Sequence, residues 1–342
     1  MATRSGLDAQ VGFGAETTYG TAGTINHFVE FDEENFQFQP TWLEGEGIRA
    51  GKKYKRASRV GISRKAVTGQ LTFKVPNKGI GLLIKHMIGS SVTTPAQIDS
   101  SDAYAQIHTP GDHYGKSLTF QVGRPEPGTG TVQPFTFVGC KCTQWELSLS
   151  DGEHLTLSTT WDGRDESTAT ALAAASYPDA ALYNFSHATL KLGGTASTAD
   201  GETAISGGAA VATVINSISV TGENPMAVER YGIGNAGLKN EPLENDYPTV
   251  TGNLDAEFSK SELYDVFKAA TPTALQLSLA FGEADTGIPF LFDFIAPAVL
   301  LKDAAPSVSG PDLVRMTTEF EVYDDGTNPT FQIKIVSTDT TL

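Results

Sequence analysis

The chain has 342 residues, 39% of them hydrophobic, and a formal net charge of −16, which is enough for one large or two ordinary domains. The acidic balance disfavours nucleic acid and anionic membranes as partners. No run of about 18 apolar residues is present to cross a membrane, and the opening MATRSGLDAQ lacks the apolar segment of a secretory signal.

The chain begins with a segment rich in Gly and Thr, residues 1–26, which we interpret as an N-terminal arm outside the core. A first domain is predicted over residues 27–162. Its first strand covers 28–39, where phenylalanines alternate with glutamines as in a half-buried strand. A loop is predicted over 40–65.

This loop belongs to a strongly basic part of the chain. Between Gly47 and Ile98 there is no Asp or Glu, whereas 11 of the 24 Lys and Arg residues lie there. A solvated surface loop and a nucleic-acid patch are two interpretations. We favour a third, in which the loop docks on the acidic surface of another subunit. The predicted contact residues are Trp42, Arg49, Lys52, Lys53, Tyr54, Lys55, Arg56 and Arg59.

Residues 67–89 predict a strand, a break at Pro76 and a short helix, because apolar residues first alternate and then recur at helical spacing. Residues 250–272 repeat this pattern 183 positions later without a gap. Val67-Thr68-Gly69 matches Val250-Thr251-Gly252, and Leu71 matches Leu254. Chance similarity of two strand–helix segments is one explanation. The repeated order of the flanking elements favours two tandem copies of one small domain.

The rest of the first half predicts a polar insertion over 90–116 and further strands. The Asp151-Gly152 pair predicts a tight hairpin turn between two of these strands. Residues 163–180 are small and polar and form a predicted linker. The second domain, 181–342, follows the same course as the first, with strands over 214–220, 250–258, 275–281, 314–323 and 331–336, a loop over 223–247 and a helix over 261–270. The predicted fold class is mainly β, a β-sandwich or open barrel with one α-helix per domain.

Motifs that carry chemistry are weak in this sequence. The GxGxxG match at 232–237 is followed by prolines that prevent a helix, so we interpret it as a flexible loop and not as a dinucleotide site. The remaining candidates are His108 with Asp112 and His113, the Cys140-Lys141-Cys142 pair and the Asp324-Asp325-Gly326 turn, none of which has the spacing of a metal site. The two cysteines also do not favour a mutual disulfide. We expect no cofactor, no metal and no catalysis.

The segment from Gly12 to Ala22, GFGAETTYGTA, resembles the start of the tail tube (major tail) proteins of long-tailed, siphovirus-type bacteriophages. The order of strands, charged loop and helix is similar over most of the chain. The resemblance implies a structural subunit that self-assembles into stacked rings around a β-lined channel. Phage DNA passes through that channel during ejection without specific binding. The implied location is the virion tail, assembled in the host cytoplasm, with other tail proteins at the tube ends and no membrane partner.

Single-domain members of the family are implied to form hexameric rings. A duplicated chain implies a homotrimer with pseudo-sixfold symmetry, and a homohexamer is the alternative. The polar faces of the repeated strands predict the lining of the channel, at Gln37, Gln39, Thr68, Gln70, Thr72, Thr251, Asn253 and Asp255. A second functional hypothesis is a β-sandwich adhesion or carbohydrate-binding protein of a virion or cell surface, which a stable monomer with sugar affinity would favour.

Overall fold

The computed structural model describes residues 5–308 and 310–342. The strands of the first half are β1 (Gln10–Ala15), β2 (His27–Val29), β3 (Glu33–Glu34), β4 (Gln37–Glu44), β5 (Val60–Lys74), β6 (Ala96–Gln97), β7 (Tyr104–His108), β8 (Leu118–Pro125), β9 (Val132–Ser150), β10 (Thr156–Gly163) and β11 (Asp165–Ser167). Those of the second half are β12 (Ala188–Leu192), β13 (Thr195–Ala199), β14 (Glu202–Ser206), β15 (Ala209–Ala210), β16 (Ile215–Glu223), β17 (Thr249–Glu257), β18 (Thr273–Asp285), β19 (Ile288–Asp303), β20 (Arg315–Val322) and β21 (Gln332–Ser337).

Helices are few and short. Among the described residues, α1 (Gly81–Met87) follows β5 and α2 (Glu262–Ala269) follows β17, so each half has one α-helix at the predicted place. Short 3-10 helices are η1 (Gly6–Asp8), η2 (Ala57–Arg59) and η3 (Phe185–His187). All of α1 except Lys85 is buried, whereas α2 buries Leu263 and leaves most of its surface in solvent. The predicted mainly β fold class is confirmed.

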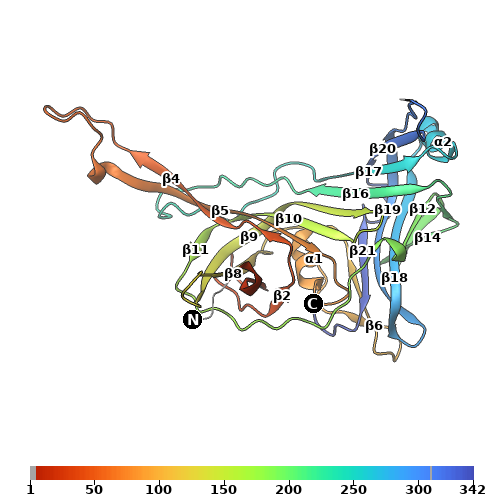
Figure 1. Cartoon of the computed structure of the whole chain (residues 1–342), viewed down its shortest axis with the longest axis horizontal. Coiled ribbons are helices and arrows are strands. Elements are labelled where there is room, and N and C mark those ends of the chain that lie inside the picture. Colours follow the sequence, from red (N-terminus) through yellow and green to blue (C-terminus); the bar gives the residue numbers. More distant parts are fainter. Residues whose placement is uncertain (1–4, 309) are drawn as a thin grey trace.

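The two halves pair their strands in the same order. In the first half, β5 lies between β4 and β10, and β9 pairs with the far side of β10. In the second half, β17 lies between β16 and β20, and β19 pairs with β20. β16 also pairs with the C-terminal part of β9. One sheet therefore runs through both halves in the order β4-β5-β10-β9-β16-β17-β20-β19, with the first half on the left and the second on the right in Figure 1.

The hydrophobic core is also continuous between the halves. Alternate residues of the strands are fully buried, and Trp145 of β9 packs against Phe331 of the second half with ring centroids 5.7 Å apart. The repeated Thr-Gly pair has a packing reason. A Cβ at Gly69 would lie 2.1 Å from the Phe36 ring, and a Cβ at Gly252 would lie 2.2 Å from the Phe320 ring. An aromatic ring thus covers the bare backbone at both positions.

The prediction of an N-terminal arm over 1–26 is wrong for the described residues. β1 pairs with both β2 and β8, and its Val11 and Phe13 side chains are fully buried. Glycine here serves close packing, since a Cβ at Gly14 would lie 1.9 Å from the Thr24 carbonyl oxygen. Residues 1–4 of the predicted arm lie outside the described residues.

Two other predicted irregular segments contain strands. The predicted loop 40–65 is mostly a long hairpin of β4 and β5, paired out to Glu44 and Val60 and closed by residues 45–59. The predicted insertion 90–116 contributes β7, which pairs with β21 and so extends the sheet of the second half. Its polar side chains concealed this strand, because Gln106 and His108 are buried together, with a hydrogen bond of 3.2 Å between their side chains.

The predicted linker 163–180 lies along the first half and is held by hydrogen bonds. It contains β11, which pairs with β9, and then continues without regular structure. The side-chain amide of Gln121 donates to the Ala171 carbonyl oxygen at 3.0 Å, and that of Gln10 donates to the Ala173 carbonyl oxygen at 2.8 Å. These bonds fix the path of the chain between the two halves.

Three buried histidines make the stability of the fold depend on pH. Burial lowers the pKa of His86 and of His108 to about 3 and that of His113 to about 4, compared with about 6.5 in an unfolded chain. Between these values the unfolded chain binds more protons than the folded chain. The free energy of unfolding therefore falls as the pH drops from about 6.5 towards 4.

We expect the urea concentration at the unfolding midpoint to be lower at pH 5 than at pH 7. Each buried histidine should reduce the free energy of unfolding by about 2 kcal/mol over this interval. His108→Gln removes one of these groups, so its stability falls less over the same interval. The exposed His154 provides the control, and His154→Gln should keep the wild-type pH dependence. Denaturation curves at the two pH values measure both, and identical pH dependence of the two variants would contradict the assignment.

Candidate functional site

The continuous sheet has one buried and one solvent-facing side, because side chains alternate along each strand. In β5, Val67 and Leu71 point into the core and Thr68 points out, and β17 repeats this with Val250, Leu254 and Thr251. All the predicted channel-lining residues lie on the solvent-facing side, and each is exposed or half-buried: Gln37, Gln39, Thr68, Gln70, Thr72, Thr251, Asn253 and Asp255. The structure therefore brings these eight residues together on one surface, which we call the polar face.

Strand registers arrange the polar face in rows that cross both halves. One row runs Thr72, Ser158, Glu146, Thr221, Thr251 and Glu321 from β5 to β20. The next runs Lys74, Thr156, Ser148, Ser219, Asn253, Glu319 and Asp303 from β5 to β19. Every residue named in these rows carries a polar side chain, and the first row ends on β19 at the half-buried Leu300.

The charge of the polar face is mainly negative. Its carboxylates include Glu146 and Glu319, whereas its cations lie near the margins and have acidic partners. The ion pairs are Lys74 with Asp32 at 3.5 Å, Arg315 with Asp255 at 3.7 Å and Lys302 with Glu321. The middle of the face therefore offers a phosphate-bearing molecule little reason to bind.

The hairpin of β4 and β5 projects far beyond the body of the molecule (Figure 1). Trp42 pairs with Ile62, and Glu44 pairs with Val60, so Trp42, Ile62 and Val60 share one side of the hairpin. All three are exposed, Trp42 by 60%. An isolated two-stranded hairpin has no core of its own, so this apolar stripe is suited to contact with another surface.

The tip of the hairpin, residues 45–59, holds six basic residues and one acidic residue. Lys55 pairs with Glu44 at 2.6 Å and with Glu46 at 3.0 Å, and these hydrogen bonds raise the pKa of its ammonium group. The ion pairs of the described residues include none for Arg49, Lys52, Lys53, Arg56 or Arg59. The structure thus places all eight predicted contact residues on one projecting element.

The sequence did not reveal the buried ion pairs that hold the loop 223–247 across the first half. Lys239 binds Asp162 at 2.6 Å and Lys141 binds Glu241 at 2.6 Å, with both lysine side chains almost completely buried. Burial raises the pKa of Asp162 and lowers that of Lys141. The only signal in the sequence was a lysine between two buried cysteines, which breaks the alternation of β9.

The same loop supports the base of the hairpin. The Lys65 backbone N–H donates to the Gly237 carbonyl oxygen at 2.8 Å, and the Arg64 guanidinium lies 4.8 Å from the centre of the Tyr231 ring. Gly237 ends the GxGxxG match, which lies in this irregular loop as predicted and has no helix after it. The base of the hairpin is therefore fixed to the body, whereas its tip is not.

The described residues contain no cluster of three or more His, Cys, Asp or Glu side chains that could hold a metal ion. Cys140 and Cys142 are free and buried, and burial raises the pKa of both thiols. Asp325 holds a turn, since its carboxylate accepts from the backbone N–H groups of Thr327 and Asn328. Within the described part of the chain, no helix is long and apolar enough to cross a membrane.

A family model described as phage tail tube protein matches residues 6–322 of the chain. The chain belongs to the phage tail tube protein family. It is thus a structural component of the virion tail and assembles into a tube with copies of itself and other tail proteins. No individual curated protein matches the sequence. The match begins at Gly6, the first residue of η1.

We expect Lys239→Met to destabilise the tail tube protein by about 3–5 kcal/mol, because the substitution leaves the buried Asp162 carboxylate without its partner. Adding Asp162→Leu should recover much of this loss, since the unpaired charge is then removed. Lys55→Met removes an exposed ion pair and should leave the unfolding midpoint close to that of the parent. Denaturant unfolding of the four proteins measures these effects, and equal midpoints for Lys239→Met and Lys55→Met would refute the assignment.

Proposed function

We propose that this protein forms the rings of the tail tube and that its polar face lines the channel for DNA. The observation that carries the proposal is the run of polar and acidic side chains across seven paired strands of both halves. Contacts with phosphate groups add up along a DNA molecule and would slow its passage. A wall with its few cations paired at the margins avoids such contacts.

We further propose that the two halves are tandem copies of one tube domain. The correspondence extends beyond the repeated strand and helix. η1 and η3 each carry a capping box, begun by Ser5 and Asn184, and precede β1 and β12. These strands pair with β8 and β18 in turn. The copies are best delimited from η1 and from η3, which places residues 5–26 in the first domain and keeps 163–180 as the linker.

A ring of three chains contains six such domains and keeps the pseudo-sixfold symmetry. The polar face of one chain runs from β4 at one end to the last residues of β19 at the other, where residues 300–303 pair with β20 alone. Edge strands leave backbone hydrogen-bonding groups unpaired, and closure of a ring removes both edges. A homohexamer with twelve domains is the alternative, and it needs a channel about twice as wide for the same sheet geometry.

The basic hairpin, residues 40–65, is proposed to dock on acidic surface of a neighbouring chain. The loop 223–247 is its counterpart in the second half, and Lys239 of that loop already binds Asp162 across the boundary between the halves. The position that matches Asp162 in the second half is Glu321, since β10 and β20 pair with the repeated strands in the same register. A carboxylate is therefore present where the hairpin of the next chain would cross, and its present partner is the half-exposed Lys302.

The proposal assigns no catalytic role to any residue and places assembly in the host cytoplasm. The adhesion hypothesis has less support, because the polar face lacks the exposed aromatic side chains on which sugar rings stack. Purified protein imaged by negative-stain electron microscopy separates the two functions. Rings or tubes support the tube subunit, whereas a stable monomer that binds carbohydrate supports the adhesin.

We predict three chains in each ring, because each chain supplies two corresponding domains. Native mass spectrometry of rings or short tubes should give ring masses that are multiples of three chains. Symmetry in averaged end-on images of the same rings provides an independent measurement. Rings of six chains would overturn the trimer and leave the tube function intact.

We predict that Lys52→Glu, Lys53→Glu, Lys55→Glu and Arg56→Glu in one variant abolish tube formation in the absence of DNA, because like charges then meet at the docking site. The control variant carries Lys260→Glu and Lys268→Glu. Lys260 precedes α2 and Lys268 lies on it, and this variant should form normal tubes. Circular dichroism checks that both variants fold. Normal empty tubes from the hairpin variant would refute docking and favour contact of the hairpin with DNA.

A further inference from the structure

The boundary between the two halves contains a complete example of how two tube domains join. We call the pairing of β16 with residues 144–150 of β9 the internal joint. Its register places Glu223 opposite Gln144, Thr221 opposite Glu146 and Ser219 opposite Ser148. Two further backbone bonds close the joint beside the strands, from Asp151 N–H to the Asn216 carbonyl oxygen at 2.8 Å and from Phe185 N–H to the Glu153 carbonyl oxygen at 3.0 Å.

The second half offers the same surface as β9 but leaves it uncovered. A bulge interrupts the pairing of β9 with β10 at Thr143, and a bulge interrupts β19 with β20 at the matching residue, Lys302. Beyond it, the bridge between Ser307 and Arg315 repeats the pairing of Ser148 with Thr156. Residues 303–308 therefore correspond to 144–149. Among the described residues, no strand pairs with their outer edge.

The first half offers the same surface as β16, and it is also uncovered. Glu34 pairs with Leu71 and Gln37 with Thr68. Those are the positions at which β16 pairs Ile218 with Leu254 and Thr221 with Thr251. Residues 33–39 therefore correspond to 217–223. In the described part of the chain, β3 and β4 pair with β5 alone.

We propose that residues 303–308 of one chain pair antiparallel with residues 34–39 of a second copy, in the register of the internal joint. This outer joint places Asp303 opposite Gln39, Ala304 opposite Phe38, Ala305 opposite Gln37 and Ser307 opposite Asn35, in the order that the internal joint fixes. The inference rests on the proposed ring-forming function and adds the partner surface and its register.

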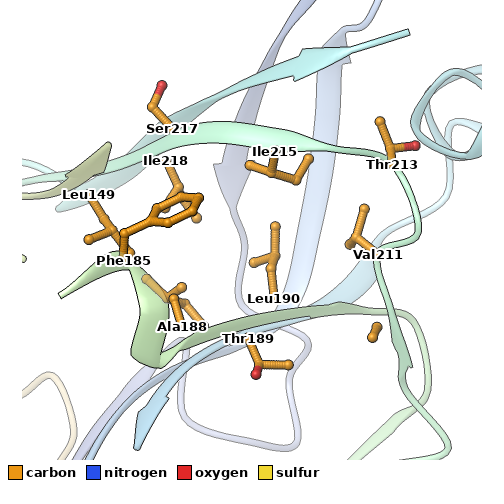
Figure 2. Close-up of a pocket in the computed structure, with 12 residues that line it drawn as sticks. Leu149, Phe185, Ala188, Thr189, Leu190, Val211, Thr213, Ile215, Ser217 and Ile218 are labelled. Carbon is orange, nitrogen blue, oxygen red and sulfur yellow. The ribbon is translucent and has the colours of Figure 1, made fainter. Parts of the chain in front are cut away.

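Exposed apolar side chains support the outer joint. Val308 is 76% exposed, whereas its counterpart Leu149 is almost completely buried in the internal joint. Leu149 there lies beside Phe185 and Ile218 at one end of an apolar cavity of about 280 Å³ (Figure 2). Leu149 thus lines an apolar recess within the chain. The outer joint places Val308 opposite Glu34, the counterpart of Ile218, so it covers the exposed valine without reproducing that recess.

The turn beside the strands gives a second apolar contact. Residues 310–314 correspond to the turn 151–155, and residues 5–8 correspond to 184–187, which meet in the internal joint through the Phe185–Glu153 bond. Leu313 is 65% exposed and Leu7 is 97% exposed. Both residues fall on these matching segments, so the outer joint brings two exposed leucines of neighbouring chains into the same region.

Pro306 has no backbone N–H to donate, and the strand edge that it faces in the outer joint does not require one. The Asn35 N–H donates to the Gln70 carbonyl oxygen of β5, so the backbone groups of Phe36 point to the free edge. The Phe36 carbonyl oxygen already accepts from the Arg124 guanidinium at 2.5 Å. The proposed register places Pro306 opposite Phe36. Its missing donor therefore leaves no carbonyl oxygen unsatisfied on the facing strand.

Disulfide trapping tests the register. Gln37 and Ala305 form a non-hydrogen-bonded cross-strand pair in the outer joint, with Cα atoms about 4.5 Å apart, which suits a disulfide. Chains with Gln37→Cys are mixed with chains with Ala305→Cys, assembled, oxidised and run on a non-reducing gel. Random mixing brings the two cysteines together at about one interface in four, so we expect about half of the assembled protein to appear as covalent dimers. The native cysteines do not interfere, because both are fully buried.

Two matched pairs control the experiment. Thr221→Cys with Glu146→Cys in one chain occupies the equivalent internal positions and should close within the chain. Gln37→Cys mixed with Ser307→Cys is displaced by two residues, about 7–8 Å apart, and should give little dimer. Gln39→Cys mixed with Asp303→Cys is a second in-register pair if the first disturbs folding.

The outcomes separate the joint from the function. Tubes with dimers from both in-register pairs support the proposal. Tubes with dimers from the displaced pair alone, or with no dimers, overturn the register and leave the tube function standing. Absence of rings and tubes from the reduced wild-type protein overturns the proposed function and the outer joint together.

Discussion

The structure depends on the requirement that the backbone groups of a strand edge be paired. β9 and β16 satisfy this requirement for each other, and their seven residue pairs join two similar halves into one sheet and one core. The same requirement remains unmet at β4 and beyond β19, at the two ends of that sheet. A protein whose family builds tubes thus exposes unpaired edges at opposite ends, where a second copy satisfies them.

Charge is distributed in a way that serves the same arrangement. The polar face carries acids along its length and keeps its cations paired at the margins, while the surplus of positive charge is carried away from it on the tip of the projecting hairpin (Figure 1). Separation of the two prevents the basic residues from neutralising the face in the folded chain. It also gives the hairpin a long reach towards acidic surface on another molecule, where several weak ion pairs act together.

Buried polar groups fix the relation between the halves. Lys141 and Lys239 are held in the interior by Glu241 and Asp162, and the strand β7 carries His108 and Gln106 from the first half into the sheet of the second. Such groups cost free energy to bury and contribute only when every partner is in place. They specify one arrangement of the loop 223–247 and of the insertion, which purely apolar packing would leave less well defined.

The sequence by itself determined the mainly β class, the repeated strand and helix and the polar face, because alternation and helical spacing are local properties of the chain. The eight predicted polar-face residues share one surface for this reason. Only the tertiary structure decided that residues 10–15 belong to the core, that 104–108 form a strand of the second half and that Lys141 and Lys239 are buried. Each of these depends on partners more than 50 residues away in the chain, and glycine or polar composition conceals them. The internal joint is of the same kind, since pairing between β9 and β16 follows from long-range register that no local pattern records.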